Sequence, residues 1–174
     1  MIVRKATAAD LQAVSNIYDE IHTVEESGNS SVGWIRNIYP TSDTARNALQ
    51  REDLFVAEEE GKIVGAAIIN QQQMDSYEHA HWNYIAPAQE VMVLHTLVID
   101  PKITGKGYGK EFVRFYERYA VSQGCRYLRI DTQAKNTRAR AMYRKLGYRE
   151  ADIVPCEFNG IEGVQLVLLE KKCD

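Results

Sequence analysis

A glycine- and lysine-rich segment, residues 105–110, is the part of the chain best suited to hold an anion. It reads Gly-Lys-Gly-Tyr-Gly-Lys and follows an apolar stretch, residues 94–99, that predicts a strand. Glycines lack the Cβ atoms that keep a ligand off the main chain, and a helix starting here would turn its N–H groups toward one point. Lys106 and Lys110 would add positive charge, so the segment predicts a binding site for a diphosphate.

The spacing of these glycines fits neither of the common nucleotide-binding motifs. The Walker pattern needs Ser or Thr after its lysine, but Lys110 is followed by Glu111. The dinucleotide fingerprint Gly-x-Gly-x-x-Gly fails because Gly109 follows Gly107 at the wrong interval. Taken alone, the segment is equally consistent with a tight turn between a strand and a helix.

A second motif downstream, residues 136–148, makes the interpretation specific. It reads Asn-Thr-Arg-Ala-Arg-Ala-Met-Tyr-Arg-Lys-Leu-Gly-Tyr. The pair resembles motifs A and B of the GNAT superfamily of N-acetyltransferases, which commonly read Arg/Gln-x-x-Gly-x-Gly and Asn-x-x-Ala-x-x-x-Tyr-x-x-x-Gly-Phe/Tyr. Thr104 stands where the family usually has Arg or Gln, so the chain lacks one usual contact to the cofactor phosphates, for which Lys102 is a candidate substitute.

The resemblance implies both a fold and a cofactor. The fold would be α/β, with a mixed, mostly antiparallel central sheet, a splayed parallel strand pair and helices on both faces. The cofactor would be acetyl-CoA, its pantetheine arm bound by the main chain of the strand and its diphosphate by the glycine segment. The residues expected at the cofactor are Leu97, Val98, Ile99, Gly105, Lys106, Gly107, Tyr108, Gly109, Lys110, Asn136, Ala139 and Tyr143.

Acetyl transfer to an amine requires a base for the amine and a proton for the departing thiolate. The resemblance assigns the acid to Tyr143, the tyrosine of motif B. His95 is one candidate base, because Leu-His-Thr-Leu at residues 94–97 resembles the Leu-His-x-Leu of arylalkylamine acetyltransferases. Glu90 is the rival, since GNAT enzymes often use a glutamate on this strand. Equally, His95 could be packed in the sheet and Glu90 could anchor a strand end.

The acceptor is predicted from aromatic and acidic residues in two polar segments. Trp34, Tyr39, Tyr77 and Trp82 could form an aromatic lid, and nearby carboxylates would favour a cation. The predicted acceptor is therefore a small-molecule primary amine. Two alternatives remain open: an acetyltransferase acting on peptides or proteins, and a non-catalytic sensor that binds acyl-CoA.

Composition is that of a single small enzyme domain spanning residues 1–174. The net charge of −3 and the pI near 5.8 argue against a nucleic-acid partner. The sequence predicts no membrane span and no signal peptide, and its three widely spaced cysteines suggest reduced thiols with no metal site. A cytoplasmic enzyme is expected, and dimerisation, common in the family, is left open.

The hydrophobic patterns predict alternating strands and helices. One helix should start after Thr7 and end near His22, and the helix from Tyr108 should bury a stripe with Phe112, Phe115 and Tyr119. Expected strands cover residues 2–5, 54–58, 63–71, 90–99, 126–132, 148–158 and 161–170, with further helices at 32–37, after 42 and in motif B.

Overall fold

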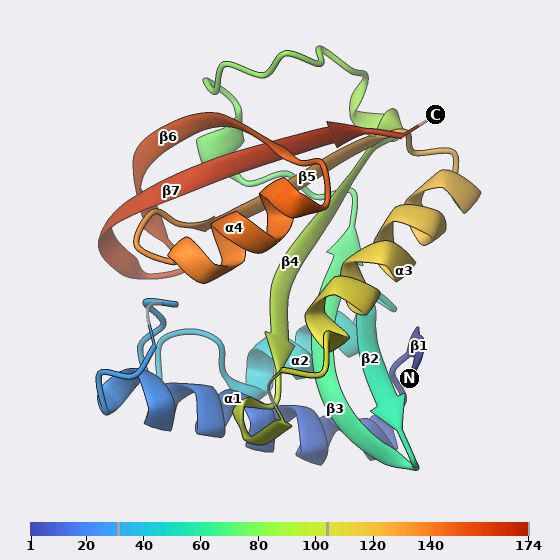
Figure 1. Cartoon of the computed structure of the whole chain (residues 1–174), viewed down its shortest axis with the longest axis vertical. Helices are drawn as coiled ribbons and strands as arrows, with labels where there is room; N and C mark the ends of the chain where they lie inside the picture. The colour runs from blue at the N-terminus through green and yellow to red at the C-terminus, as the bar shows by residue number, and fades with distance from the viewer. Residues whose placement is uncertain (31, 104, 174) are drawn as a thin grey trace.

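The protein folds around one seven-stranded sheet in the order β1-β2-β3-β4-β5-β7-β6 (Figure 1). The structure, a computed structural model, describes residues 1–30, 32–103 and 105–173. The strands are β1 (Ile2–Lys5), β2 (Leu54–Glu59), β3 (Lys62–Asn70), β4 (Val91–Ile99), β5 (Tyr127–Gln133), β6 (Arg149–Phe158) and β7 (Ile161–Lys172). The α-helices are α1 (Leu11–Glu26), α2 (Ser42–Gln50), α3 (Tyr108–Ser122) and α4 (Thr137–Lys145).

Helices cover both faces of the sheet because each strand alternates its side chains between two cores. On β2, Leu54 and Val56 join a buried cluster with α1 and α2, whereas Phe55 and Ala57 join a cluster with α3. The segment 71–90 covers a third cluster, which includes Val91 and Val93 of β4. The expected mixed, mostly antiparallel sheet with helices on both faces is confirmed.

The parallel pair β4–β5 separates partway along its length. Pairing runs from Val91 opposite Tyr127 to Leu94 opposite Ile130, and the strands diverge beyond that point. Thr96 sits in a β-bulge with φ of 52°, where β4 loses register with β3. The strands therefore open toward the start of α3, where β4 gives way to the glycine segment.

A buried polar pair fixes the segment 71–90 against β5 and β7. The Arg129 guanidinium lies 3.9 Å from the ring centroid of Trp82 and donates to the carbonyl of Tyr84. Glu170, only 2% exposed, accepts hydrogen bonds from the N–H groups of Asn83 at 2.9 Å and Tyr84 at 3.2 Å. The segment is thus held by charges inside the fold, in addition to its apolar contacts.

Most predicted elements are confirmed, with four differences. α1 continues to Glu26 instead of ending near His22, and residues 32–37 form turns and a bridge instead of a helix. Glu90 belongs to a 3-10 turn, Ala88–Glu90, that precedes β4. α3 also buries Tyr116, which the sequence did not single out, while Phe115 and Tyr119 of the predicted stripe are partly buried against the same cluster.

Candidate active site

A cavity of about 830 Å³ lies where β4 and β5 diverge. Its wall is built by these two strands together with α1, α3, α4 and the segment that follows α1. A volume of this size is typical of a ligand site. All the residues expected at the cofactor line it: Leu97, Val98, Ile99, Gly105, Lys106, Gly107, Tyr108, Gly109, Lys110, Asn136, Ala139 and Tyr143.

The part of the cavity between α3 and α4 is suited to a polyanion. Gly105 and Gly107 have φ angles of +88° and +82°, which glycine adopts without strain, and Gly107 caps α3 with no side-chain acceptor for the helix N–H groups. Four cationic side chains line this region and form no ion pair with any described residue: Lys106, Lys110, Arg138 and Lys145. Thr104, the departure from the motif, lies outside the described residues.

α3 and α4 approach each other at Gly109 and Met142. A Cβ on Gly109 would lie 3.4 Å from the sulfur of Met142, which is an ordinary van der Waals distance, so a methyl group would fit at this position. Asn136 caps α4, its Oδ1 accepting from the N–H of Ala139 at 3.2 Å. Asn136 and Ala139 thus have structural roles in addition to their position at the cavity wall.

Tyr143 presents its ring to the cavity from α4 and is 5% exposed. The ring packs against Tyr148 in an edge-to-face contact with centroids 5.9 Å apart. Burial, followed by the nearby charge of Asp131, raises the pKa of the Tyr143 phenol, so the group carries its proton at neutral pH. Its hydroxyl has no hydrogen-bond partner within the described part of the chain, which leaves the proton available to a ligand.

Asp131 is a wall residue that the sequence did not single out. It lies on β5 directly after Ile130, the last residue paired with β4, and one of its oxygens accepts a 2.7 Å hydrogen bond from the Tyr77 hydroxyl. Burial raises the pKa of this carboxyl to about 6. The sequence signal for Asp131 was its place in the predicted strand, which reads Leu-Arg-Ile-Asp at residues 128–131. Sequence alone does not tell whether an acidic residue in such a strand faces a cavity or the solvent.

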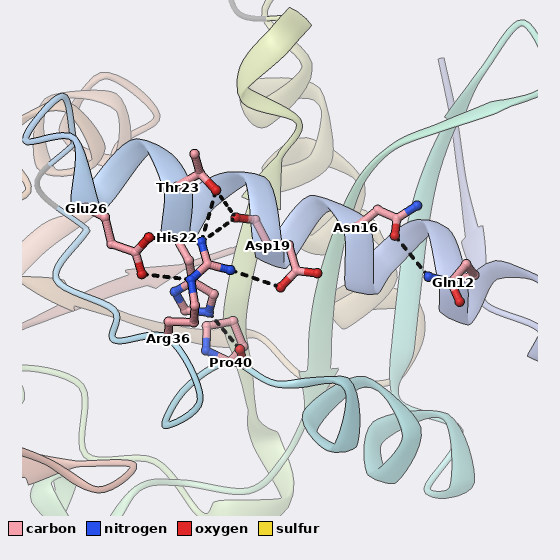
Figure 2. A network of polar contacts seen from close by, with 8 residues as sticks. All are labelled: Gln12, Asn16, Asp19, His22, Thr23, Glu26, Arg36 and Pro40. Atoms are coloured by element: carbon pink, nitrogen blue, oxygen red, sulfur yellow. Dashed lines mark hydrogen bonds and ion pairs between the residues drawn. The ribbon is translucent and has the colours of Figure 1, made fainter.

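The segment after α1 forms the wall opposite α4 and contributes Trp34 and Tyr39. Figure 2 shows how this segment is tied to α1. Arg36 bonds Glu26 at 2.7 Å and also contacts Asp19 and Thr23, while the ring of His22 contacts the carbonyl of Pro40 at 2.9 Å. The Tyr39 hydroxyl also hydrogen-bonds Thr96 at the bulge of β4. The aromatic wall is therefore anchored at both ends.

Comparison with known proteins decides the family. The sequence profile described as "Acetyltransferase (GNAT) family" matches residues 11–148, most of the chain. The chain belongs to the GNAT family. It is therefore an acyltransferase that uses acetyl-CoA as the acyl donor.

Individual relatives agree with this family. An uncharacterised N-acetyltransferase of Methanocaldococcus jannaschii is 24% identical over 99% of this chain and 92% of its own length. A GNAT-family structure from Streptococcus agalactiae superimposes with a TM-score of 0.82 at 18% identity, covering 99% of this chain and 95% of that one. An acetyltransferase of Salmonella typhimurium, solved with its cofactor acetyl-CoA, gives a TM-score of 0.71 at 18% identity over 100% and 94% of the two chains.

Two of the predicted lid aromatics of this GNAT chain do not line the cavity. Tyr77 is buried beneath the sheet, where its hydroxyl binds Asp131. Trp82 packs on Arg129, and its ring N–H donates to the carbonyl of Tyr77 at 2.9 Å. Their segment covers the sheet behind β5, so only Trp34 and Tyr39 of the predicted lid meet the cavity.

The two predicted bases also lie away from the cavity wall. Glu90 precedes β4 at the end where β4 and β5 are paired. The Nε2 atom of His95 is 3.1 Å from Oδ1 of Asn70 and 3.0 Å from the carbonyl of Gln72. Both partners are acceptors, so we assign the ring proton to Nε2. Burial lowers the pKa of His95 to about 4, so the ring is neutral at neutral pH.

Replacing His95 with Gln tests its role directly. Because the glutamine amide can donate to Asn70 and Gln72 in place of Nε2, we expect the pH profile of kcat/KM to stay unchanged. The measurement is acetyl transfer between pH 5 and 9, with the proportion of folded protein checked by circular dichroism. A loss of rate with a flattened profile would instead make His95 the base.

No group of three or more His, Cys, Asp and Glu side chains is arranged to hold a metal ion within the described part of the chain. No helix among residues 1–30, 32–103 and 105–173 has both the length and the apolar character needed to span a bilayer.

Proposed function

We propose that the chain transfers an acetyl group from acetyl-CoA directly to the primary amine of a small molecule, with Tyr143 donating a proton to the departing sulfur. The observation that carries this proposal is the unpartnered, protonated Tyr143 hydroxyl on the wall of a cavity lined by the expected cofactor residues. Bound acetyl-CoA would supply the activated acyl group. The residues described here would position it, hold its phosphates and manage protons.

The positions of the charged side chains along the cavity support one orientation of bound acetyl-CoA. Lys106, Lys110, Arg138 and Lys145 would hold phosphate groups between α3 and α4, because unpaired ammonium and guanidinium groups attract phosphate strongly. The main chain of Leu97–Ile99 faces the gap left by β5 and would bind the amide-bearing arm. In this proposal the reactive end of the cofactor would lie toward Tyr143 and the diverging strands.

The wall formed by Trp34 and Tyr39 favours a small acceptor. Its anchors to α1 and to Thr96 hold the segment over the cavity, and a fixed aromatic wall limits the space for an extended peptide. Peptide acetylation remains the second candidate, and it predicts that this wall moves aside. The proposal treats residues 1–174 as one domain, since all three buried clusters share the one sheet.

A thiol-release assay with acetyl-CoA tests the proposal. Purified protein is supplied with small amines that carry an apolar or aromatic part, with matched carboxylic acids and alcohols, and with short peptides bearing free N-termini or lysines. We expect turnover with the small amines and none with the acids or alcohols. Turnover confined to peptides would favour the second candidate. Tight binding of acetyl-CoA, measured by calorimetry, without turnover of any acceptor would favour a sensor.

A further inference from the structure

We infer that Asp131 binds the ammonium group of the acceptor and removes its proton. This inference rests on the proposed function, because it assigns the acceptor of that same cavity to the class of cationic amines. It replaces His95 and Glu90 as the base with a carboxylate that lies on the cavity wall.

The position of Asp131 follows from the divergence of the sheet. Residues 127–130 of β5 are paired with β4, and Asp131 is the first residue beyond that pairing. The side chain lines the cavity together with Tyr143, Thr96 and Tyr39. A carboxylate at this point faces the space that an acceptor must enter to meet the acyl group.

The carboxylate has one fixed contact and no cation. Oδ2 accepts from the Tyr77 hydroxyl at 2.7 Å, and the described residues supply the carboxylate of Asp131 with no other hydrogen bond and no ion pair. Asp131 is half-buried, and a carboxylate that is partly removed from water without a countercharge is unfavourable. An incoming ammonium group would provide the missing charge, so the site favours cationic acceptors over neutral or acidic ones.

The groups that face Asp131 are neutral at physiological pH. They come from each element around it: Tyr77 from the segment 71–90, Tyr39 from the segment after α1, Tyr143 from α4 and Cys156 from β6. Burial raises the pKa of each of these four groups. Among these five groups, Asp131 is therefore the one that carries a charge at neutral pH.

The proton affinity of Asp131 suits it to act as a base. Burial raises its pKa from 3.8 to about 6, so it is mostly ionised at neutral pH yet accepts a proton more readily than an ordinary aspartate. Its charge also contributes to the raised pKa of the Tyr143 phenol. When Asp131 takes a proton that contribution disappears, and Tyr143 becomes a stronger acid as the sulfur departs.

The proton balance of this assignment is complete. An N–H bond of the ammonium breaks, an O–H bond forms on Asp131, and the nitrogen gains the lone pair that forms the new C–N bond as the C–S bond breaks. The second nitrogen proton replaces the one that Tyr143 gives to the thiol. Overall, ammonium and thioester give amide, thiol and one proton, which Asp131 releases to solvent.

Asp131→Asn tests the inference through rate and pH dependence. The wild-type profile of kcat/KM should have an acid limb near pH 6, where Asp131 ionises. The kcat/KM of the variant should be about 100-fold lower than that of wild type at neutral pH. Its residual rate should rise with pH toward the pKa of the amine itself, ~10.4 for an alkylamine of the lysine type. Asp43→Asn, at an exposed position on α2 where the carboxylate pairs with Arg46, is the matched control and should leave the profile unchanged.

A second variant, Tyr77→Phe, tests whether Asp131 acts through its proton or only supports the structure of the site. The hydrogen bond from Tyr77 lowers the pKa of Asp131, opposing the effect of burial. Without that bond the acid limb should move to higher pH, while the rate well above the limb is largely retained. A uniform loss of rate with an unmoved limb would contradict the assignment of Asp131.

The thermal stability of the ligand-free protein tests Asp131 without any turnover. A carboxyl with a raised pKa in the folded state contributes its full stability below pH 3.8 and loses it as pH rises through about 6. Asp131→Asn should therefore have a higher Tm than wild type at pH 8. A lower Tm at pH 8 would show a purely structural aspartate and overturn the inference even if the enzyme acetylates amines.

A binding experiment distinguishes failure of the proposed function from failure of the inference about Asp131. If wild type acetylates no amine, the proposed function fails, and the inference is then decided by binding. Phenethylamine, a simple aromatic ammonium ion at neutral pH, should raise the Tm of wild type and leave that of Asp131→Asn unmoved. Equal stabilisation of both proteins would overturn the inference.

Discussion

Tyr143→Phe lowers kcat by about a thousandfold, the largest change in rate expected from any single substitution described here. The phenylalanine ring keeps the packing against Tyr148 but removes the hydroxyl that Tyr143 presents to the cavity. Because the cationic residues between α3 and α4 are untouched, the affinity for acetyl-CoA should stay close to that of wild type. Steady-state kinetics and calorimetric titration with acetyl-CoA provide the two measurements.

Tyr148→Phe is the matched control for this experiment. Tyr148 belongs to the same buried aromatic pair, but it does not line the cavity. Its replacement should leave kcat unchanged within the error of the assay. Equal losses in the two variants would mean that Tyr143 acts through packing and that the acid lies elsewhere.

Glu170→Ala reduces the free energy of unfolding by about 3–5 kcal/mol. The substitution leaves the N–H groups of Asn83 and Tyr84 without their acceptor. It also removes a negative charge that favours the charged form of Arg129, a residue only 8% exposed. The measurement is urea denaturation followed by circular dichroism, with the m-value checked for two-state behaviour.

Glu162→Ala provides the comparison on the same strand. Glu162 is exposed on β7, so its removal should change the free energy of unfolding by no more than about 0.5 kcal/mol. If Glu170→Ala were as mild as this control, the contacts with Asn83, Tyr84 and Arg129 would contribute little to holding the segment 71–90. A protein that fails to fold at all is the extreme form of the expected result.

The sequence predicted the cofactor region well because both motifs are local. The glycine segment and the helix from Asn136 each place their residues through short-range geometry, and the cavity contains every residue expected from them. The turns that join β2 to β3 and β6 to β7 are equally local, since Glu60-Gly61 and Asn159-Gly160 adopt the positive φ angles that a tight turn needs.

The catalytic base and the acceptor site depend on contacts between distant parts of the chain. His95 was expected at the acceptor, but the alternation of β4 turns it toward Asn70, and the bulge at Thr96 changes which residues face the cavity. Asp131 matters only because β4 and β5 diverge at that point, which no local pattern in β5 reveals. Tyr77 illustrates the same difficulty, since its aromatic character did not indicate that it would lie beneath the sheet.

The unpaired cations between α3 and α4 also affect how fast the cofactor arrives. The chain as a whole carries a net charge of −3, which repels a polyanion at long range. Lys106, Lys110, Arg138 and Lys145 add positive charge beside the cavity. Their attraction for a polyanion acts mainly within the last Debye length of the approach, ~8 Å at physiological ionic strength. Added salt screens both effects, and the association rate of acetyl-CoA therefore reflects a balance between global repulsion and local capture.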